Sequence, residues 1–407
     1  MCPPTRDEPA EEMGSSEKSV QTESQAPFPW HVGVCDAHCH PTDTMPSIAS
    51  IGNMKARVLT IMATRSQDQT LVASVAADHA IQSRDILSDS AGPRGTKVVP
   101  AYGWHPWFSH QLYNDSAEAP TYALDNTSES QKPRHYEAVL TPAPDAAFVA
   151  SLPEPQPLSE FLAATRQRLL ALPTAMVGEI GVDRAFRLPS GDVEQSSRDE
   201  NITPGGREGR MLSPYHVKME HQLLVLKAQL RLAGEIGRPV SVHGVQAHGV
   251  LFDALASLWK GYEKEVISRR KKRLVAQGAE DFSSDDEDEN EEPYTAKPFP
   301  PRICLHSFSG PPQMLRQYLN PEIPATLFFS FSIGVNLGGP KSEAKFAEVI
   351  QACPDDKLLI ESDLHTAGDQ MDEQLEQIGR KVCEIKGWTL DEGLVRLRRN
   401  YEDFVYA

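Results

Sequence analysis

The chain has 407 residues, 40% of them hydrophobic, and its formal net charge at pH 7 is −17. A chain of this length can bury a sizeable core, and α/β barrels often reach such a length as single domains. The acidic balance argues against a protein that coats nucleic acid through a broad basic face, although bound metal ions can still attract phosphate esters.

Cysteine spacing and hydropathy exclude further classes of protein. The six cysteines show neither a paired zinc-ribbon spacing nor a disulfide-rich pattern, so we expect reduced thiols. The sequence also lacks an apolar run long enough to cross a bilayer. We therefore expect an intracellular protein, in the cytoplasm, the nucleus or both, with no membrane partner.

Residues 1–30 are rich in Pro, Glu, Ser and Gln, which predicts a disordered tail. From residue 31 onward, short apolar runs have the composition of strands that are covered on both faces. There are eight of them: Val32–Ala37, Arg57–Ala63, Lys97–Gly103, Ala175–Gly181, Pro239–His243, Arg302–His306, Thr326–Ile333 and Lys357–Asp363.

Helical patterns separate several of these runs and close the chain. They cover Asp68–Ser83, Leu158–Leu172, Tyr215–Gly237, His248–Tyr262, Ser342–Ala352, Met371–Lys386 and Thr389–Val405. Eight strands that alternate with helices predict an α/β fold, a (β/α)8 TIM barrel over residues 31–407. An open doubly wound sheet is the alternative, although such a sheet usually has fewer strands.

Three polar segments interrupt the alternation, at about residues 109–157, 185–213 and 263–300. The first is rich in Pro, Ser and Ala, and the last holds a basic run followed by an acidic run. We interpret all three as long surface insertions into the barrel that are at least partly disordered.

Side chains that bind metals follow several of the predicted strands. His38 and His40 follow the first strand, and two residues that are two apart on a strand point to the same side. Glu179, His243, His306 and Asp363 belong to the ends of the fourth, fifth, sixth and eighth strands. Because the strands of such a barrel place their carboxyl ends on one face, we predict a metal centre there.

Each of these residues has a plainer interpretation when it is taken alone. His243 could be a core histidine, Glu179 half of a buried ion pair, and Asp363 a helix N-cap. The joint pattern over five strands favours metal binding. Imidazole suits Zn²⁺ or Mn²⁺, carboxylates also suit Mg²⁺, and a carboxylate such as Glu179 can bridge two ions that clamp a phosphoryl group.

Three further side chains lie near the predicted strand ends. Trp104 either forms a wall of the pocket or packs in the core. His248 and His365 are candidates for contact with a substrate.

These motifs resemble those of the TatD family of metal-dependent deoxyribonucleases, a branch of the amidohydrolase-like barrels. They occur in the family's order from about residue 33 to the C-terminus. The matching segments are Asp36-Ala37-His38-Cys39-His40, Gly103-Trp104-His105-Pro106, Gly178-Glu179-Ile180-Gly181-Val182-Asp183, Val242-His243, His306-Ser307-Phe308-Ser309-Gly310, Ser330-Phe331-Ser332 and Glu361-Ser362-Asp363. The long insertions make the chain most similar to a divergent fungal branch described as partners of an anaphase-promoting-complex subunit.

The resemblance implies two divalent metal ions, Mg²⁺, Mn²⁺ or Zn²⁺. His38 and His40 would hold the first ion, which Asp363 completes, and His243 and His306 would hold the second. Glu179 would bridge the two ions.

The resemblance also implies hydrolysis of a phosphodiester, with DNA as the substrate. Asp363 would act as the general base, so Asp363 and Glu179 are the expected catalytic residues. His105 would line the substrate pocket.

Two positions depart from the family pattern. The family usually has an Arg two residues after the strand-five histidine, where this chain has Val245. It often follows the strand-eight Asp with a small residue and then Pro, where this chain has Leu364-His365. An interaction protein on a barrel with weak or absent nuclease activity is therefore one alternative. An amidohydrolase that cleaves a C–N or lactone bond is another, but Glu179 stands where that wider superfamily often has a carboxylated Lys.

Overall fold

The structure is a computed structural model that describes residues 26–81, 96–122, 131–191, 199–266, 294–339 and 342–406. Most of the predicted N-terminal tail lies outside these residues. So does 267–293, the greater part of the third predicted insertion.

The described residues form a barrel of parallel strands, which confirms the predicted TIM barrel. Eight strands build it, and each overlaps one of the predicted apolar runs: β1 (Cys35–Cys39), β2 (Val58–Met62), β3 (Lys97–Ala101), β7 (Val177–Asp183), β9 (Val240–Val245), β10 (Arg302–Leu305), β11 (Thr326–Phe331) and β12 (Leu358–Ile360). They pair as two parallel sheets, in the orders β1-β2-β3 and β12-β11-β10-β9-β7.

Backbone hydrogen bonds join the two sheets at both edges. Between β3 and β7, the amide of Tyr102 donates to the carbonyl of Met176 at 3.0 Å. Just beyond β1 and β12, the amide of Asp363 donates to the carbonyl of His38 at 3.0 Å, and that of His40 to Leu364 at 2.8 Å. The second junction lies at the metal-ligand motifs, so closure of the barrel also brings those motifs together.

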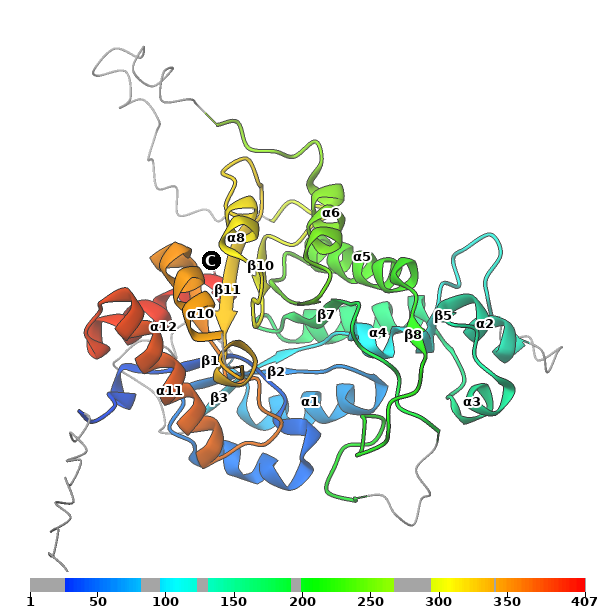
Figure 1. Cartoon of the computed structure of the whole chain (residues 1–407), viewed down its shortest axis with the longest axis horizontal. Helices are drawn as coiled ribbons and strands as arrows, with labels where there is room; N and C mark the ends of the chain where they lie inside the picture. The colour runs from blue at the N-terminus through cyan, green and yellow to red at the C-terminus, as the bar shows by residue number, and fades with distance from the viewer. Residues whose placement is uncertain are drawn as a thin grey trace, which may run out of the picture.

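Helices surround the strands (Figure 1). They include α1 (Ser66–His79), α4 (Leu158–Ala171), α5 (Met219–Ile236), α6 (His248–Trp259), α8 (Pro312–Tyr318), α10 (Ser342–Ala352), α11 (Asp369–Lys386) and α12 (Leu390–Tyr406). Short helical turns follow other segments: η1 (Trp30–Val32), η2 (Pro41–Asp43), η3 (Met45–Asn53), α9 (Ile333–Asn336) and η8 (Asp355–Lys357). No helix of the described residues combines the length and apolar character that crossing a membrane demands.

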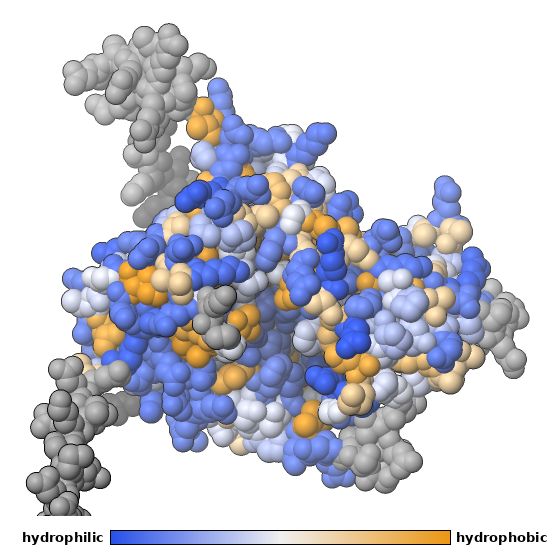
Figure 2. All heavy atoms as spheres, in the orientation of Figure 1, coloured by the Kyte–Doolittle hydropathy of each residue, from blue (hydrophilic) through white to orange (hydrophobic). Residues whose placement is uncertain are grey.

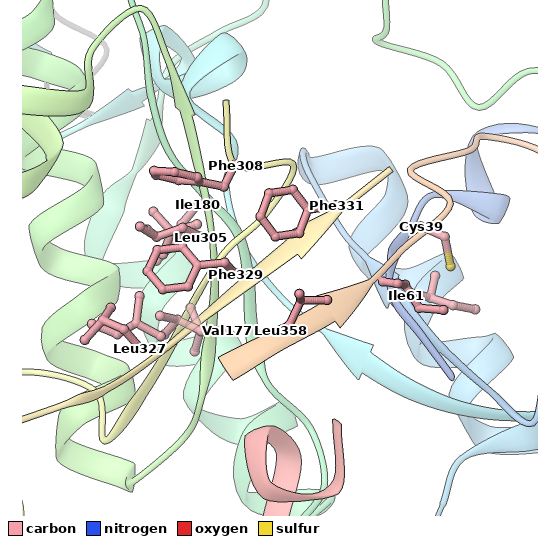
Figure 3. Close-up of a cluster of buried hydrophobic side chains, with 14 of the residues drawn as sticks. Cys39, Ile61, Val177, Ile180, Leu305, Phe308, Leu327, Phe329, Phe331 and Leu358 are labelled. Atoms are coloured by element: carbon pink, nitrogen blue, oxygen red, sulfur yellow. The ribbon is translucent and has the colours of Figure 1, made fainter. Parts of the chain in front are cut away.

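Two hydrophobic clusters hold the barrel together. The larger one joins strand residues to the surrounding helices, and Figure 3 shows part of it, where Ile180 of β7, Leu305 of β10 and Phe329 of β11 lie close together. The second joins strands from opposite sides of the barrel, so its side chains fill the interior. It includes Tyr401 of α12, whose hydroxyl lies 2.7 Å from Thr60 Oγ1 and anchors the last helix to β2.

The predicted insertion at 109–157 holds short elements of its own. They are η5 (Pro106–Gln111), β4 (Leu112–Tyr113), α2 (Gln131–Val139), β5 (Leu140–Thr141), α3 (Ala146–Ser151) and β6 (Gln156–Pro157), with β8 (His216–Val217) paired to β5. In Figure 1, α2 and α3 lie at the edge of the molecule, away from the barrel. A separate buried cluster that includes Tyr136, Phe148 and Tyr215 packs them as a small unit. The face seen in Figure 2 is mostly hydrophilic, with scattered hydrophobic side chains.

Candidate metal centre

All six predicted metal ligands lie together at the carboxyl ends of the strands. His38 Nε2 is 3.1 Å from His40 Nε2, and His243 Nδ1 is 3.2 Å from His306 Nε2. His40 Nε2 lies 3.6 Å from Asp363 Oδ1. All four histidines are buried, and His40, His243 and His306 line a cavity together with Glu179 and Asp363. The structure therefore assembles five strand ends that are up to 325 residues apart in the chain into one cluster, from His38 to Asp363.

Glu179 stands at the centre of the cluster, and its two oxygens face different histidine pairs. Oε2 lies 3.5 Å from His38 Nε2 and 3.4 Å from His40 Nε2. Oε1 lies 3.0 Å from His243 Nδ1 and 2.8 Å from His306 Nε2. One carboxylate thus connects two separate pairs of nitrogen ligands.

Two glycines of the family motifs allow this close arrangement. A Cβ atom on Gly103 would come within 2.6 Å of the Gly178 backbone, next to Glu179. A Cβ atom on Gly181 would come within 2.1 Å of the His243 carbonyl oxygen. Side chains at either position would push apart the strands that carry Glu179 and His243, so the glycines are needed for the geometry of the ligands.

Polar side chains hold two of the histidines in place. Ser241 Oγ lies 2.8 Å from His38 Nδ1, and Asp183 Oδ2 lies 3.1 Å from His243 Nε2. Asp183 is itself fixed, because its Oδ2 accepts a 2.6 Å hydrogen bond from Trp107 Nε1. Contacts of this kind fix the orientation of metal-binding imidazoles and the nitrogen that remains free for an ion.

Two buried carboxylates brace the strand ends without facing the cavity. Asp36 accepts hydrogen bonds from the backbone amides of His38 at 3.1 Å and Ser362 at 3.0 Å, which ties β1 to β12. Glu361 accepts a 2.7 Å hydrogen bond from the amide of Ser307. Ser307 and Asp363 have positive φ values of 41° and 54°, a strained conformation for residues other than glycine, and these contacts hold it.

Burial and charge act in opposite directions on the acids of the centre. Burial alone would raise the pKa of Glu179, but His105, His306 and His38 outweigh it and hold the pKa well below its usual range. For Asp363, burial dominates and raises the pKa, although His306 and His38 oppose the shift. Glu179 is thus held as an anion, while Asp363 is the carboxyl group that holds a proton more readily.

His105 also reaches the centre, with Nε2 3.1 Å from Glu179 Oε1. Its Nδ1 accepts a 3.2 Å hydrogen bond from the backbone amide of Trp107. A neutral imidazole that accepts at Nδ1 carries its proton on Nε2, so His105 donates to Glu179. This places the predicted pocket residue at the centre as a hydrogen-bond donor.

The donor set fits divalent cations. Three groups of side chains have ligand atoms within 4.8 Å of one another: His38, His40 and Glu179; His105, Glu179 and His243; and His38, His306 and Asp363. Imidazole nitrogens face one another and a carboxylate, an arrangement of lone pairs that a shared cation stabilises. Because its Nε2 holds the proton, His105 is the member of these groups least suited to bind an ion.

A cavity of about 390 Å³ opens above the cluster. Trp107, Phe108, Phe186, Pro189 and Ile202 form the apolar part of its lining, and the Trp107 ring lies edge-on to His105 with centroids 4.7 Å apart. This volume lies within the range of about 300–1,000 Å³ that is usual for sites that bind small molecules.

Part of the predicted insertion at 185–213 builds the cavity. The amide of Thr203 donates to the carbonyl of Asp43 at 2.9 Å, and Arg65 Nε donates to the carbonyl of Pro204 at 2.9 Å. These bonds hold residues 199–213 over the barrel mouth, where Ile202, Gly206, Arg207 and Glu208 line the cavity.

Sequence reasoning missed the network around Arg65. The guanidinium is buried and lies 2.9 Å from Asp43 Oδ1 and 3.2 Å from Asp68 Oδ2. Asp43 also contacts His365 Nδ1 at 2.8 Å. The position of Arg65, two residues after the end of the second apolar run, was a signal that could have identified it.

Of the three further candidates, His365 lines the cavity, whereas Trp104 and His248 do not. His365 lines the cavity, and its ring stacks on His40 with centroids 5.2 Å apart. Trp104 is buried in the core against Phe161, so core packing is its role. His248 lies beside Phe308, outside the lining of the cavity.

Comparison with known proteins gives a family. The family described as TatD related DNase matches residues 35–405. The chain is 38% identical over 375 residues to Cut9-interacting protein scn1 of Schizosaccharomyces pombe, a match that covers 91% of this chain and 98% of that protein. It is 25% identical over 320 residues to an uncharacterized deoxyribonuclease of Saccharomyces cerevisiae, which covers 76% of this chain and 82% of that protein.

Solved structures are also similar. A TatD homologue from Escherichia coli has 17% identity and a TM-score of 0.47, and the match covers 92% of this chain and 98% of that one. An uncharacterized amidohydrolase from Saccharomyces cerevisiae has 14% identity and a TM-score of 0.49, with 92% of this chain and 99% of that one covered.

Proposed function

The chain belongs to the TatD-related DNase family, and on this premise we propose that it is a metal-dependent phosphodiesterase, a deoxyribonuclease with two divalent cations. The observation that carries the proposal is the position of Glu179, with Oε1 toward His243 and His306 and Oε2 toward His38 and His40. A carboxylate between two pairs of imidazoles is the arrangement that a two-metal hydrolase needs.

In this proposal the ligands divide into two sets. His38, His40 and Asp363 would hold one ion, His243 and His306 would hold the other, and Glu179 would be shared between them. Mg²⁺, Mn²⁺ and Zn²⁺ are all compatible with nitrogen and carboxylate ligands. When bound, such ions polarise a phosphate oxygen and lower the pKa of a bound water.

The chain's own residues do the remaining work. Asp363 is the proposed general base, because burial raises its pKa toward the range in which a carboxylate can accept a proton from water. Asp183 keeps His243 oriented through its 3.1 Å contact with Nε2. His105 lines the cavity and donates to Glu179, and it is the proposed substrate-binding residue.

A nuclease assay tests this function. Purified protein with Mg²⁺, Mn²⁺ or Zn²⁺ is incubated with end-labelled single-stranded and double-stranded DNA. We expect metal-dependent cleavage that Asp363→Asn reduces by at least about a hundredfold, since it removes a general base. Asp403→Asn, which changes an exposed aspartate at the far end of α12, is the matched control and should cleave normally. Cleavage that survives in the Asp363 variant, or is absent from the wild type, would contradict the proposal.

A second candidate function is protein interaction, in the cytoplasm or nucleus. It is favoured by the name of the Schizosaccharomyces pombe relative and by Val245, which offers no cation for phosphate. Pull-down with the whole chain and with a variant that lacks 267–293 tests whether that segment docks a partner. Phe299 must be kept, since it is buried in the core. An unchanged set of partners would exclude the segment as the docking element. The position of Glu179 continues to disfavour cleavage of a C–N or lactone bond.

A further inference from the structure

The cavity above the metal centre has two walls of different chemistry. One part of its lining is rich in imidazole and carboxylate groups, whereas Trp107, Phe186, Pro189 and Ile202 present carbon surface beside them. A site that received only an inorganic anion would gain nothing from an apolar wall. The pairing of the two walls indicates a ligand with an anionic end and a flat apolar end.

The aromatic part of the apolar wall is rigid. The rings of Trp107 and Phe186 stack with centroids 4.3 Å apart and planes 10° apart. The 2.6 Å hydrogen bond from Trp107 Nε1 to Asp183 Oδ2 fixes the indole. A preformed flat surface of this kind costs little conformational entropy when a planar group packs on it.

Two arginines of the described residues line this cavity, and their environments differ. Arg65 is buried, and Asp43 and Asp68 balance its charge at 2.9 and 3.2 Å. Arg207 is exposed, and its Nε donates to the carbonyl of Arg210 at 3.1 Å. Within the described part of the chain, its terminal nitrogens have no carboxylate partner.

The loop that carries Arg207 is well anchored. Arg65 Nη2 donates to the carbonyl of Thr203 at 3.0 Å, and Arg210 Nη1 donates to the carbonyl of Gly191 at 2.8 Å. Glu208 also lines the cavity, but its Oε1 accepts a 2.8 Å hydrogen bond from the Gly205 amide within the same turn. Arg207 thus belongs to the cavity lining on an anchored loop, and its exposed side chain can form charge-assisted hydrogen bonds to a phosphate.

We propose that Arg207 is a substrate-binding residue that grips a phosphate oxygen, while Trp107 and Phe186 receive the attached flat group. The ligand class is an organic phosphate with an aromatic ring system, such as a nucleoside monophosphate unit. This proposal rests on the proposed function in one respect, namely that the phosphate to be cleaved lies at the metal centre. It assigns recognition of the phosphate to the segment 199–213 and recognition of the flat group to Trp107 and Phe186.

Calorimetric titration of the full chain with deoxyadenosine monophosphate tests this assignment, both with metal and after metal removal. Parallel titrations use deoxyadenosine and inorganic phosphate. We expect the nucleotide to bind more tightly than either fragment. Arg207→Ala should weaken nucleotide binding by about tenfold or more, as for the loss of a charge-assisted hydrogen bond, and leave deoxyadenosine binding unchanged. Arg207→Lys should retain part of the affinity.

Arg187→Ala is the matched control, because Arg187 is an exposed arginine of the same insertion outside the cavity lining. It should bind the nucleotide as the wild type does. Equal nucleotide affinity in wild type and Arg207→Ala would overturn the assignment, as would an equal loss of deoxyadenosine binding. Failure of the nuclease assay with intact Arg207-dependent binding would instead reject the proposed function alone.

Discussion

Single side chains decide the chemistry of this centre through their neighbours. His38 has two ring nitrogens, and Ser241 Oγ engages Nδ1 at 2.8 Å, which leaves Nε2 toward His40 and Glu179. Asp183 acts in the same way on His243. Contacts from β7 and β9 therefore orient the proposed ligands, and metal affinity would depend on residues that bind no ion.

Replacement of Ser241 tests this orientation. Ser241→Ala should weaken metal binding by about tenfold, because the loss of such a supporting contact typically costs 10–100-fold in affinity. The measurement is calorimetric titration with Zn²⁺ or Mn²⁺. Ser257→Ala, which removes a hydroxyl that bonds to Ala254 on α6, serves as the control. Equal metal affinity in both variants would show that Ser241 does not orient His38.

Gly103 offers a second test at this scale. Gly103→Ala would place a methyl group 2.6 Å from the Gly178 backbone, so we expect a loss of about 1–3 kcal/mol in the free energy of unfolding. Gly249→Ala, on α6 with open space around it, should leave stability unchanged or raise it by about 0.4–1 kcal/mol. Urea denaturation compares the two variants, and equal stabilities would contradict the close approach of β3 and β7.

At the scale of elements, the barrel strands and the insertions differ in how well the sequence predicts them. Buried parallel strands appear in the sequence as continuous apolar runs. Because the carboxyl ends of barrel strands lie on one face, these runs also predict where the candidate ligands lie. Residues 199–213 return to the barrel mouth through contacts such as Thr203 to Asp43, which lie 160 residues apart. Local patterns do not encode pairings at that distance. Arg207 therefore could not be assigned to the cavity from the sequence.

The insertion that contains α2 and α3 has buried histidines. Local sequence patterns do not distinguish them from exposed ones. His135 is fully buried, with Nε2 2.8 Å from the His110 carbonyl oxygen and Nδ1 2.7 Å from Thr121 Oγ1. Burial is the main cause that lowers the pKa of His135 to about 4, against its ordinary value of 6.5. His110 is buried in the same region, so this small unit is built around neutral imidazoles.

This pKa shift predicts acid sensitivity. Since the folded pKa lies below 6.5, the unfolded chain binds the proton first, and the stability from neutral His135 is complete above pH 6.5 and falls toward pH 4. Between pH 7 and pH 5 the loss should be about 2 kcal/mol. Urea denaturation of wild type and His135→Gln at both values measures it.

The His135→Gln variant should be less stable at pH 7 but should lose less stability between pH 7 and pH 5. His31→Gln changes a histidine whose side chain is 78% exposed, and it should follow the wild type. An acid-induced loss that is the same in all three proteins would contradict the role of His135.

For the whole molecule, the net charge of −17 and a family of nucleases stand in apparent conflict. The cavity resolves the conflict locally. Four histidines surround Glu179, and bound cations would add positive charge at the bottom of an acidic protein's cavity. In the proposed function, binding of a phosphate would depend on the loaded centre and on Arg207 rather than on a broad basic surface.

Metal should also stabilise the fold, because the ligands join five strands. Saturating Zn²⁺ or Mn²⁺ should raise Tm by about 5 °C or more over protein treated with a chelator, as expected for a ligand that binds only the folded state. Differential scanning calorimetry measures the shift. A His38→Ala/His243→Ala variant should lose most of it, and an equal shift in that variant would place the stabilising ions elsewhere.

The central claim is that Glu179 connects two metal sites. Metal content after equilibrium dialysis, measured by mass spectrometry of the digested protein, tests it most directly. The account predicts about two divalent ions per chain for the wild type and about one or fewer for Glu179→Gln, since the bridge between two ions is lost. One ion or none in the wild type, or two ions in Glu179→Gln, would contradict it.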